Sequence, residues 1–218
     1  MRQAGFALAC TLVACLAATG CRAPTVPGEA PAYDPTTLTG GVLFAWPLGR
    51  AISVYVQGES RSPDPALAAA VDRALAAWEG APRYGELRLR RVDDVRRADV
   101  VVRAIGAAPL VDESACGGGI GEGAGFTVLC ASGDTARTLP LLDGGTSRVK
   151  VSVVVDPGAM GGSLDALVAH EMGHALGVTG HSADAGDVMH VSPAVSRPSA
   201  RDGRTLRYVL HQPADVRL

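Results

Sequence analysis

The histidines of this sequence are concentrated in one short stretch. Four of the five, His170, His174, His181 and His190, lie between positions 170 and 190. His170 and His174 are four positions apart, so on an α-helix their side chains project from one face, about 40° apart, and can bind the same metal ion. Glu171 lies beside them, where its carboxylate can accept a proton from a water molecule near that ion. The spacing therefore predicts a metal site with a general base next to it.

The third ligand decides which kind of metal site this is. Neutral imidazole suits Zn²⁺, and a catalytic zinc has three protein ligands and one open position, whereas a structural zinc has four protein ligands. Glu171 is the last glutamate of the chain, which excludes a downstream glutamate as the third ligand. We expect His190 to be a loop histidine near solvent. The remaining candidates for the third ligand are His181, Asp184, Asp187 and Asp202.

The segment that carries His170 and His174 has the features of a helix. Ser163 at its start suits an N-cap, and Gly177 suits a left-handed residue at its end. The apolar residues of this segment lie on a different arc of the helix from the two histidines and are expected to face the core: Leu164, Val168, Met172, Ala175 and Leu176. The histidine face is therefore expected to line a cleft.

The rest of the chain alternates between strand and helix patterns. Strands are expected at residues 51–57, 86–92, 98–105, 126–131 and 148–156. In the last of these segments, one face carries Val149, Val151, Val153 and Val155. Asp64 as N-cap and Pro65 at the first position begin an amphipathic helix that is expected to end at about residue 79.

A closing helix follows at the end of the chain. Ser199 and Asp202 have the spacing of a capping box, and the helix is expected to end at about residue 210. Together these elements predict an α+β fold, with a five-stranded mixed twisted sheet, a backing helix, a zinc-binding central helix and a C-terminal helix.

The segment HEMGHALGVTGHSADAGDVMH resembles the metzincin zinc peptidases, and within them the matrixins in a bacterial exported form. It has a two-histidine helix, Gly177 at the bend, a third histidine and Met189 in the place of the Met-turn. The order of strands and helices extends the resemblance to about residues 46–212. One residue is inserted relative to the family spacing, because three residues rather than two separate Gly177 from His181.

The resemblance implies an activity and a set of site residues. His170, His174 and His181 would bind one catalytic Zn²⁺, Glu171 would be the general base, and Met189 would form an apolar floor beneath the metal. The implied function is a zinc-dependent metalloendopeptidase with a peptide or protein substrate. By the same resemblance, an extended peptide would pair with the edge strand near residues 126–130. The resemblance alone suggests calcium as a further bound ion.

A function of another class also fits the histidines. In this alternative the chain is a non-catalytic envelope lipoprotein that uses zinc for stability. Glu171 favours the enzyme, because a purely structural site has no need of a carboxylate that does not bind the metal.

The start of the chain has the pattern of an export signal. Arg2 and a short apolar stretch predict a signal peptide over residues 1–20, with Cys21 as the lipidated first residue of the mature chain. Residues 21–45 are rich in proline and are expected to form a tether before the peptidase domain at 46–218. We therefore expect an exported protein, either a lipoprotein at the outer membrane or cell surface, which would contact the membrane only through its lipid, or a secreted protein without lipid.

Cysteine content and charge narrow the range of partners. Cys116 and Cys130 are the two cysteines left after the leader, and export to an oxidising compartment predicts a disulfide between them. The net charge of -2 leaves no basic field for nucleic acid. The arginines within residues 88–97 form a local basic run, which is expected to be a solvent-exposed face of a strand. The glycine run that follows Cys116 is not expected to bind phosphate, because the helix that a phosphate site requires does not follow it. We expect a monomer.

Overall fold

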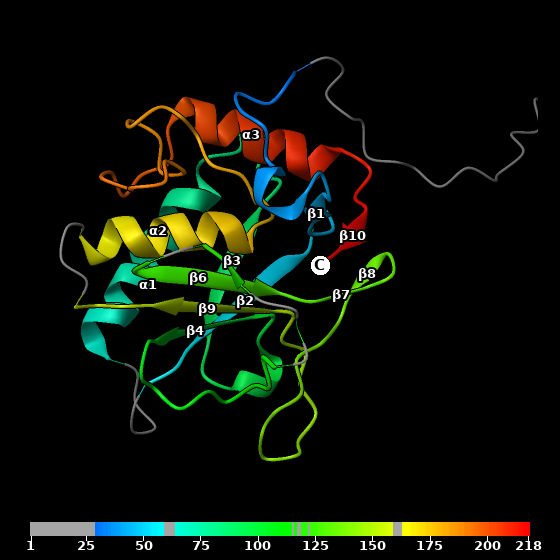
Figure 1. The fold of residues 1–218 in the computed structure, drawn as a ribbon, viewed down its shortest axis with the longest axis vertical. Coiled ribbons are helices and arrows are strands. Elements are labelled where there is room, and N and C mark those ends of the chain that lie inside the picture. Colours follow the sequence, from blue (N-terminus) through cyan, green and yellow to red (C-terminus); the bar gives the residue numbers. More distant parts are fainter. Residues whose placement is uncertain (1–28, 59–63, 115, 117–118, 122, 159–162) are drawn as a thin grey trace, which may run out of the picture.

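The larger of two β-sheets forms the centre of the protein. The computed structural model describes residues 29–58, 64–114, 116, 119–121, 123–158 and 163–218 (Figure 1). Six strands make up this sheet, in the spatial order β3 (Arg88–Val92), β2 (Ala51–Val56), β4 (Val100–Ala104), β9 (Val151–Val155), β6 (Gly125–Leu129) and β5 (Gly119–Ile120). The first four are parallel to one another, whereas β6 is antiparallel to β9 and β5 is antiparallel to β6.

The α+β class and the mixed sheet agree with the prediction, but the number of strands does not. All five expected strands lie in the larger sheet, and β5 adds a sixth outside β6. A strand of two residues that begins at a glycine carries no period-two pattern, so its sequence could not reveal it.

A second, smaller sheet joins segments from distant parts of the chain. Its strands lie in the order β1 (Phe44–Ala45), β10 (Val216–Arg217), β8 (Thr135–Ala136) and β7 (Ala131–Ser132). The pairing of β1 with β10 brings the beginning and the end of the described chain side by side. These two-residue strands were not expected either.

Three α-helices are described, namely α1 (Pro65–Glu79), α2 (Leu164–Ala175) and α3 (Ala200–His211). The capping predictions for them are confirmed. The Asp64 carboxylate accepts hydrogen bonds from two backbone amides at the start of α1, and Ser199 and Asp202 form the capping box of α3. Short 3₁₀ turns occupy Thr37–Thr39 and Val95–Arg97. Figure 1 shows α2 lying across β6 and β9, and α3 on the side of α2 that faces away from this sheet.

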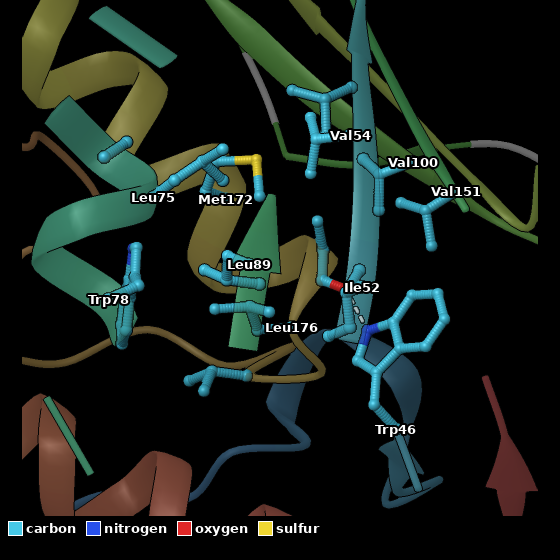
Figure 2. Packing of buried hydrophobic residues seen from close by; sticks show 14 of the residues in the cluster. Trp46, Ile52, Val54, Leu75, Trp78, Leu89, Val100, Val151, Met172 and Leu176 are labelled. Atoms are coloured by element: carbon cyan, nitrogen blue, oxygen red, sulfur yellow. Dashed lines mark hydrogen bonds between the residues drawn. The ribbon is translucent and has the colours of Figure 1, made fainter. Parts of the chain in front are cut away.

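The two faces of the larger sheet bury two separate apolar clusters. The cluster under α1 and α2 includes Ile52, Val54, Leu89, Val100 and Val151 from the strands, with Trp78 and Met172 from the helices (Figure 2). The opposite face packs against the loops that follow β4 and β6. The sheet is thus covered on both sides, and α1 and α2 also contact each other.

Val149 was expected to share a face with Val151, Val153 and Val155, but it does not. It belongs to the cluster on the opposite face of the sheet. The backbone amides of Lys150 and Val151 both donate to the Asp99 carbonyl oxygen, which places two residues opposite one. Such a local irregularity reverses the alternation of side chains at the start of the strand.

The first described residues are part of the packed domain and not of a free tether. The Glu29 carboxylate pairs with Arg207, the Tyr33 hydroxyl donates to Asp202 at 2.7 Å, and Phe44 is buried. The packed part of the chain therefore already includes residues before the predicted boundary at residue 45. The leader and Cys21 lie outside the described residues. Among the residues that are described, no helix has both the length and the apolar character needed to cross a bilayer.

Candidate metal centre

Helix α2 is held in place by two buried tryptophans. The Trp78 indole N–H donates to the Ala169 carbonyl oxygen at 2.7 Å. The Trp46 indole N–H donates to the Ala175 carbonyl oxygen at 2.9 Å (Figure 2). Ser163 caps the start of the helix, and Gly177 just beyond its end has a φ of 101°. A left-handed residue at this position turns the chain back toward the helix. The loop after α2 therefore returns beside the residues that α2 presents.

His170, His174 and His181 meet at one point. Each offers a ring nitrogen, and these three nitrogens lie within 4.8 Å of one another. The distances between ring centroids are 4.7 Å for His170 and His174, and 5.2 Å from each of them to His181. The two helical histidines and the loop histidine are thus positioned to hold one metal ion.

Backbone carbonyls orient the two helical histidines. The Nδ1 atom of His170 lies 2.8 Å from the Val188 carbonyl oxygen, and that of His174 lies 2.8 Å from the Val178 carbonyl oxygen. Each Nδ1 must therefore carry the proton and donate it, which leaves Nε2 as the atom with a free lone pair. The Nε2 atom of His174 is buried and has no hydrogen-bond partner among the described residues. Such an unsatisfied acceptor fits a metal ligand.

Burial keeps these two imidazoles neutral. It lowers the pKa of His170 to about 4, against the opposing effect of the hydrogen bond to Val188. Burial also holds the pKa of His174 well below its ordinary value, and the neighbouring His170 adds to this effect. Neutral imidazole is the form that binds metal, so the donor set of three imidazole nitrogens fits Zn²⁺.

Glu171 lies on the same helix but is held by a different element. Its side chain is only 2% exposed, and the Thr127 hydroxyl of β6 donates to its Oε2 at 2.8 Å. Burial raises the pKa of Glu171 to about 8, while the hydrogen bond from Thr127 lowers it in part. The carboxyl group is therefore poised to exchange a proton near neutral pH.

Glycines of the β5–β6 hairpin make room for this carboxyl group. A Cβ atom at Gly125 would lie 2.6 Å from Oε1 of Glu171, and one at Gly121 would lie 3.5 Å from the same atom. Any side chain at Gly125 would therefore push the carboxyl group out of its place. Two glycines of the run that follows Cys116 thus shape the space around this carboxyl group.

The alternative third ligands lie elsewhere. Asp187 accepts hydrogen bonds from two serine hydroxyls and from Arg201, and Asp202 accepts them from the Tyr33 hydroxyl and two backbone amides. Asp184 is exposed, and the Nδ1 atom of His190 contacts Ser192. Within the described residues, only His170, His174 and His181 form a group that could hold a metal. The structure therefore places His181, and none of the aspartates, next to His170 and His174.

Met189 packs against α2 at Gly173. Its side chain is fully buried, and its carbonyl oxygen accepts a hydrogen bond from the Ser182 amide at 2.8 Å. A Cβ atom at Gly173 would overlap with the Met189 sulfur and lie 2.8 Å from Cζ2 of Trp78. The helix can approach this close to Met189 only because position 173 is a glycine.

A cleft of about 860 Å³ opens beside the histidines. The residues that line it include 119–121 and 191–194, together with His170, Glu171 and His181. The predicted edge strand at residues 126–130 is not the outermost one, because Gly119 and Ile120 of β5 pair with Val128 and Thr127 of β6. The free edge that faces the cleft belongs to the segment 119–121.

The predicted disulfide is present. Cys116 and Cys130 are bonded, with their Cα atoms 5.0 Å apart, and both are buried. The bond joins the segment before β5 to the residue that follows β6. It thereby closes the base of the hairpin that forms one wall of the cleft.

Several residues of the site had no signature in the sequence. The carbonyl groups of Val178 and Val188 act through the backbone, which any residue supplies, so only the fold reveals them. Thr127 had a weak signal, because it is a polar residue in a strand segment that also contains Val128 and Leu129. No family model matches this chain, and no match was found among curated proteins.

Proposed function

We propose that this protein is an exported, zinc-dependent endopeptidase similar to the matrixins, with Zn²⁺ bound by His170, His174 and His181. The observation that carries the proposal is the position of Glu171. Glu171 lines the same cleft as His170 and His181, but its carboxyl group is held by Thr127 of another element. A site that binds zinc only for stability does not require such a group.

The free sheet edge beside the cleft supports an extended peptide as the substrate. Segment 119–121 lies at the end of the larger sheet, and it carries two glycines, so a peptide backbone can approach it closely. A peptide that adds to this edge as a further strand would pass over the histidines. The loop at residues 191–194 would then contact the side chains on the other side of the peptide.

The residues divide the work of hydrolysis between them. A zinc ion at this site supplies Lewis acidity, which activates water and polarises the carbonyl group of the substrate. Glu171 accepts a proton from the attacking water at its carboxylate and then delivers that proton to the nitrogen of the leaving amine. The Nδ1–H groups of His170 and His174 donate to the Val188 and Val178 carbonyl oxygens throughout, so the Nε2 atoms would remain available to the metal.

The test is to replace Glu171 by alanine. Glu171→Ala should keep one zinc per chain and the native fold, because the three imidazoles are untouched, but its turnover of an unfolded protein substrate should fall by about 10²-fold or more. Glu79→Ala is a matched control, since Glu79 is an exposed glutamate at the end of α1. Cleavage that survives in Glu171→Ala would show that another group is the base. A wild type that binds zinc but cleaves nothing would favour the non-catalytic envelope protein.

A further inference from the structure

An N-terminal strap, residues 34–39, lies across the loop that leads from α2 to His181. The Leu38 amide donates to the Thr179 carbonyl oxygen at 3.0 Å, and the Thr179 hydroxyl donates to the Pro35 carbonyl oxygen at 2.9 Å. The Thr39 and Thr179 hydroxyl oxygens are 3.0 Å apart. Thr179 is fully buried by these contacts. The strap thus satisfies both the backbone carbonyl and the side chain of a residue two positions before His181.

The next residue of the loop is in direct contact with the strap. A Cβ atom at Gly180 would overlap with the Asp34 carbonyl oxygen and lie 2.9 Å from Oγ1 of Thr37. Gly180 does not have a positive φ, so the backbone conformation itself does not require glycine. The glycine is needed because the strap leaves no room for a side chain.

This contact involves the segment between Gly177 and His181, which is one residue longer than in the matrixins. Val178, Thr179 and Gly180 separate Gly177 from His181. A longer loop has more conformations to lose, so it holds a metal ligand in place less well unless other contacts fix it. Val178 is fixed at its carbonyl oxygen by His174, and the other two residues are fixed by the strap. The position of His181 therefore depends on residues about 140 positions earlier in the chain.

The strap also reaches the cleft. Leu38 lines the cleft together with His181 and Val191, and it remains 44% exposed. An exposed leucine at this place offers an apolar surface to whatever binds beside the histidines.

We propose that the strap is an integral part of the metal centre: Thr179 and Gly180 dock on it to position His181, and Leu38 contacts the substrate. The inference rests on the proposed metal site. It assigns two separable roles, because the docking contacts act on the metal and Leu38 acts on the bound peptide. Displacement of residues 34–39 should therefore weaken the centre.

The first experiment measures zinc affinity of the full chain by competition with a chromophoric chelator. Thr179→Val removes the hydroxyl group with little change in shape, and Gly180→Ala pushes against the strap. Both variants should bind zinc about 10-fold more weakly than the wild type, as is usual when an outer-shell partner of a ligand is lost. Thr179→Ser restores the hydroxyl group and should retain most of the affinity. The visible spectrum of bound Co²⁺ should change in the two weakened variants and not in Thr179→Ser.

The controls are an exposed threonine and a glycine with ordinary space around it. Thr146→Val and Gly80→Ala should bind zinc as the wild type does, because Thr146 is exposed and a Cβ at Gly80 meets only contacts of 3.6 Å and above. Near-ultraviolet circular dichroism of the metal-free proteins checks the fold, and if Gly180→Ala does not fold, Thr179→Val decides. If Thr179→Val binds zinc as tightly as the wild type, the strap does not position His181. A wild type that binds no zinc refutes the proposed function instead.

The second experiment tests Leu38 by kinetics. Leu38→Ser should keep the zinc affinity and kcat of the wild type but raise KM for a peptide substrate several-fold, because it removes binding that is equal in the ground state and the transition state. An unchanged KM would refute the contact with substrate. A weakened zinc affinity would refute the division of the strap into two roles.

Discussion

The buried carboxyl group of Glu171 leads to a quantitative prediction about proton release. In the metal-free protein its pKa is about 8, raised by burial. About 0.9 of the molecules therefore carry a proton on Glu171 at pH 7. A divalent cation at the nearby histidines favours the ionised form, so binding of Zn²⁺ should expel this proton.

The two buried histidines do not add to the count at pH 7. The pKa of His170 is about 4 and that of His174 is also well below its ordinary value, so both are already neutral before the metal binds. The wild type should thus release about 0.9 more protons than Glu171→Gln at pH 7. At pH 9 Glu171 is mostly ionised in advance, so the difference should fall to about 0.1.

Isothermal titration calorimetry of the metal-free protein with Zn²⁺ measures this number. The observed enthalpy changes linearly with the ionisation enthalpy of the buffer, and the slope gives the protons released per metal bound. Glu79→Gln, an exposed helical glutamate, serves as the control and should match the wild type. Equal slopes for wild type and Glu171→Gln at pH 7, or a difference that grows from pH 7 to pH 9, would refute the reasoning.

Three other predictions test individual residues. His181→Ala should lose zinc affinity about as severely as His174→Ala, because each removes one of three ligands, and full zinc occupancy in His181→Ala would exclude His181 as the third ligand. Gly125→Ala should retain zinc but lose about 100-fold in turnover, since its Cβ displaces the Glu171 carboxyl group; unchanged turnover would show that this packing is irrelevant. In a detergent partition assay the wild type should enter the detergent phase and Cys21→Ser should not. If the two proteins partition alike, Cys21 carries no lipid and the protein is secreted without an anchor.

The elements with a strong local pattern were predictable from the sequence. The bounds of α1 follow from Asp64, Pro65 and the spacing of its apolar residues, and the structure has them where expected. His170 and His174 were predictable for a similar reason, because a separation of four positions places them on one face of a helix, whereas His181 was one of four candidates for the third ligand. In both cases, neighbouring residues in the sequence specify the feature.

The parts that could not be predicted depend on contacts between distant segments. β5 is a strand only because β6 lies beside it, and two residues carry no pattern of their own. Residues 34–39 resemble a linker in composition, and their role depends on Thr179 and Gly180, which they meet only in the folded protein. The irregularity before β9 likewise arises from the Asp99 carbonyl oxygen and not from the valine pattern.

The packing around Gly173 means that Met172 and Gly173, the two residues between Glu171 and His174, tolerate substitution to different degrees. Met172 is buried in the apolar cluster, where another flexible apolar side chain of similar volume can take its place at modest cost. At Gly173 even a methyl group would overlap with Met189 and press on Trp78. In a library that randomises both positions, functional clones should therefore vary at residue 172 and retain glycine at residue 173. A pattern search that leaves both positions free would accept sequences that this helix cannot accommodate.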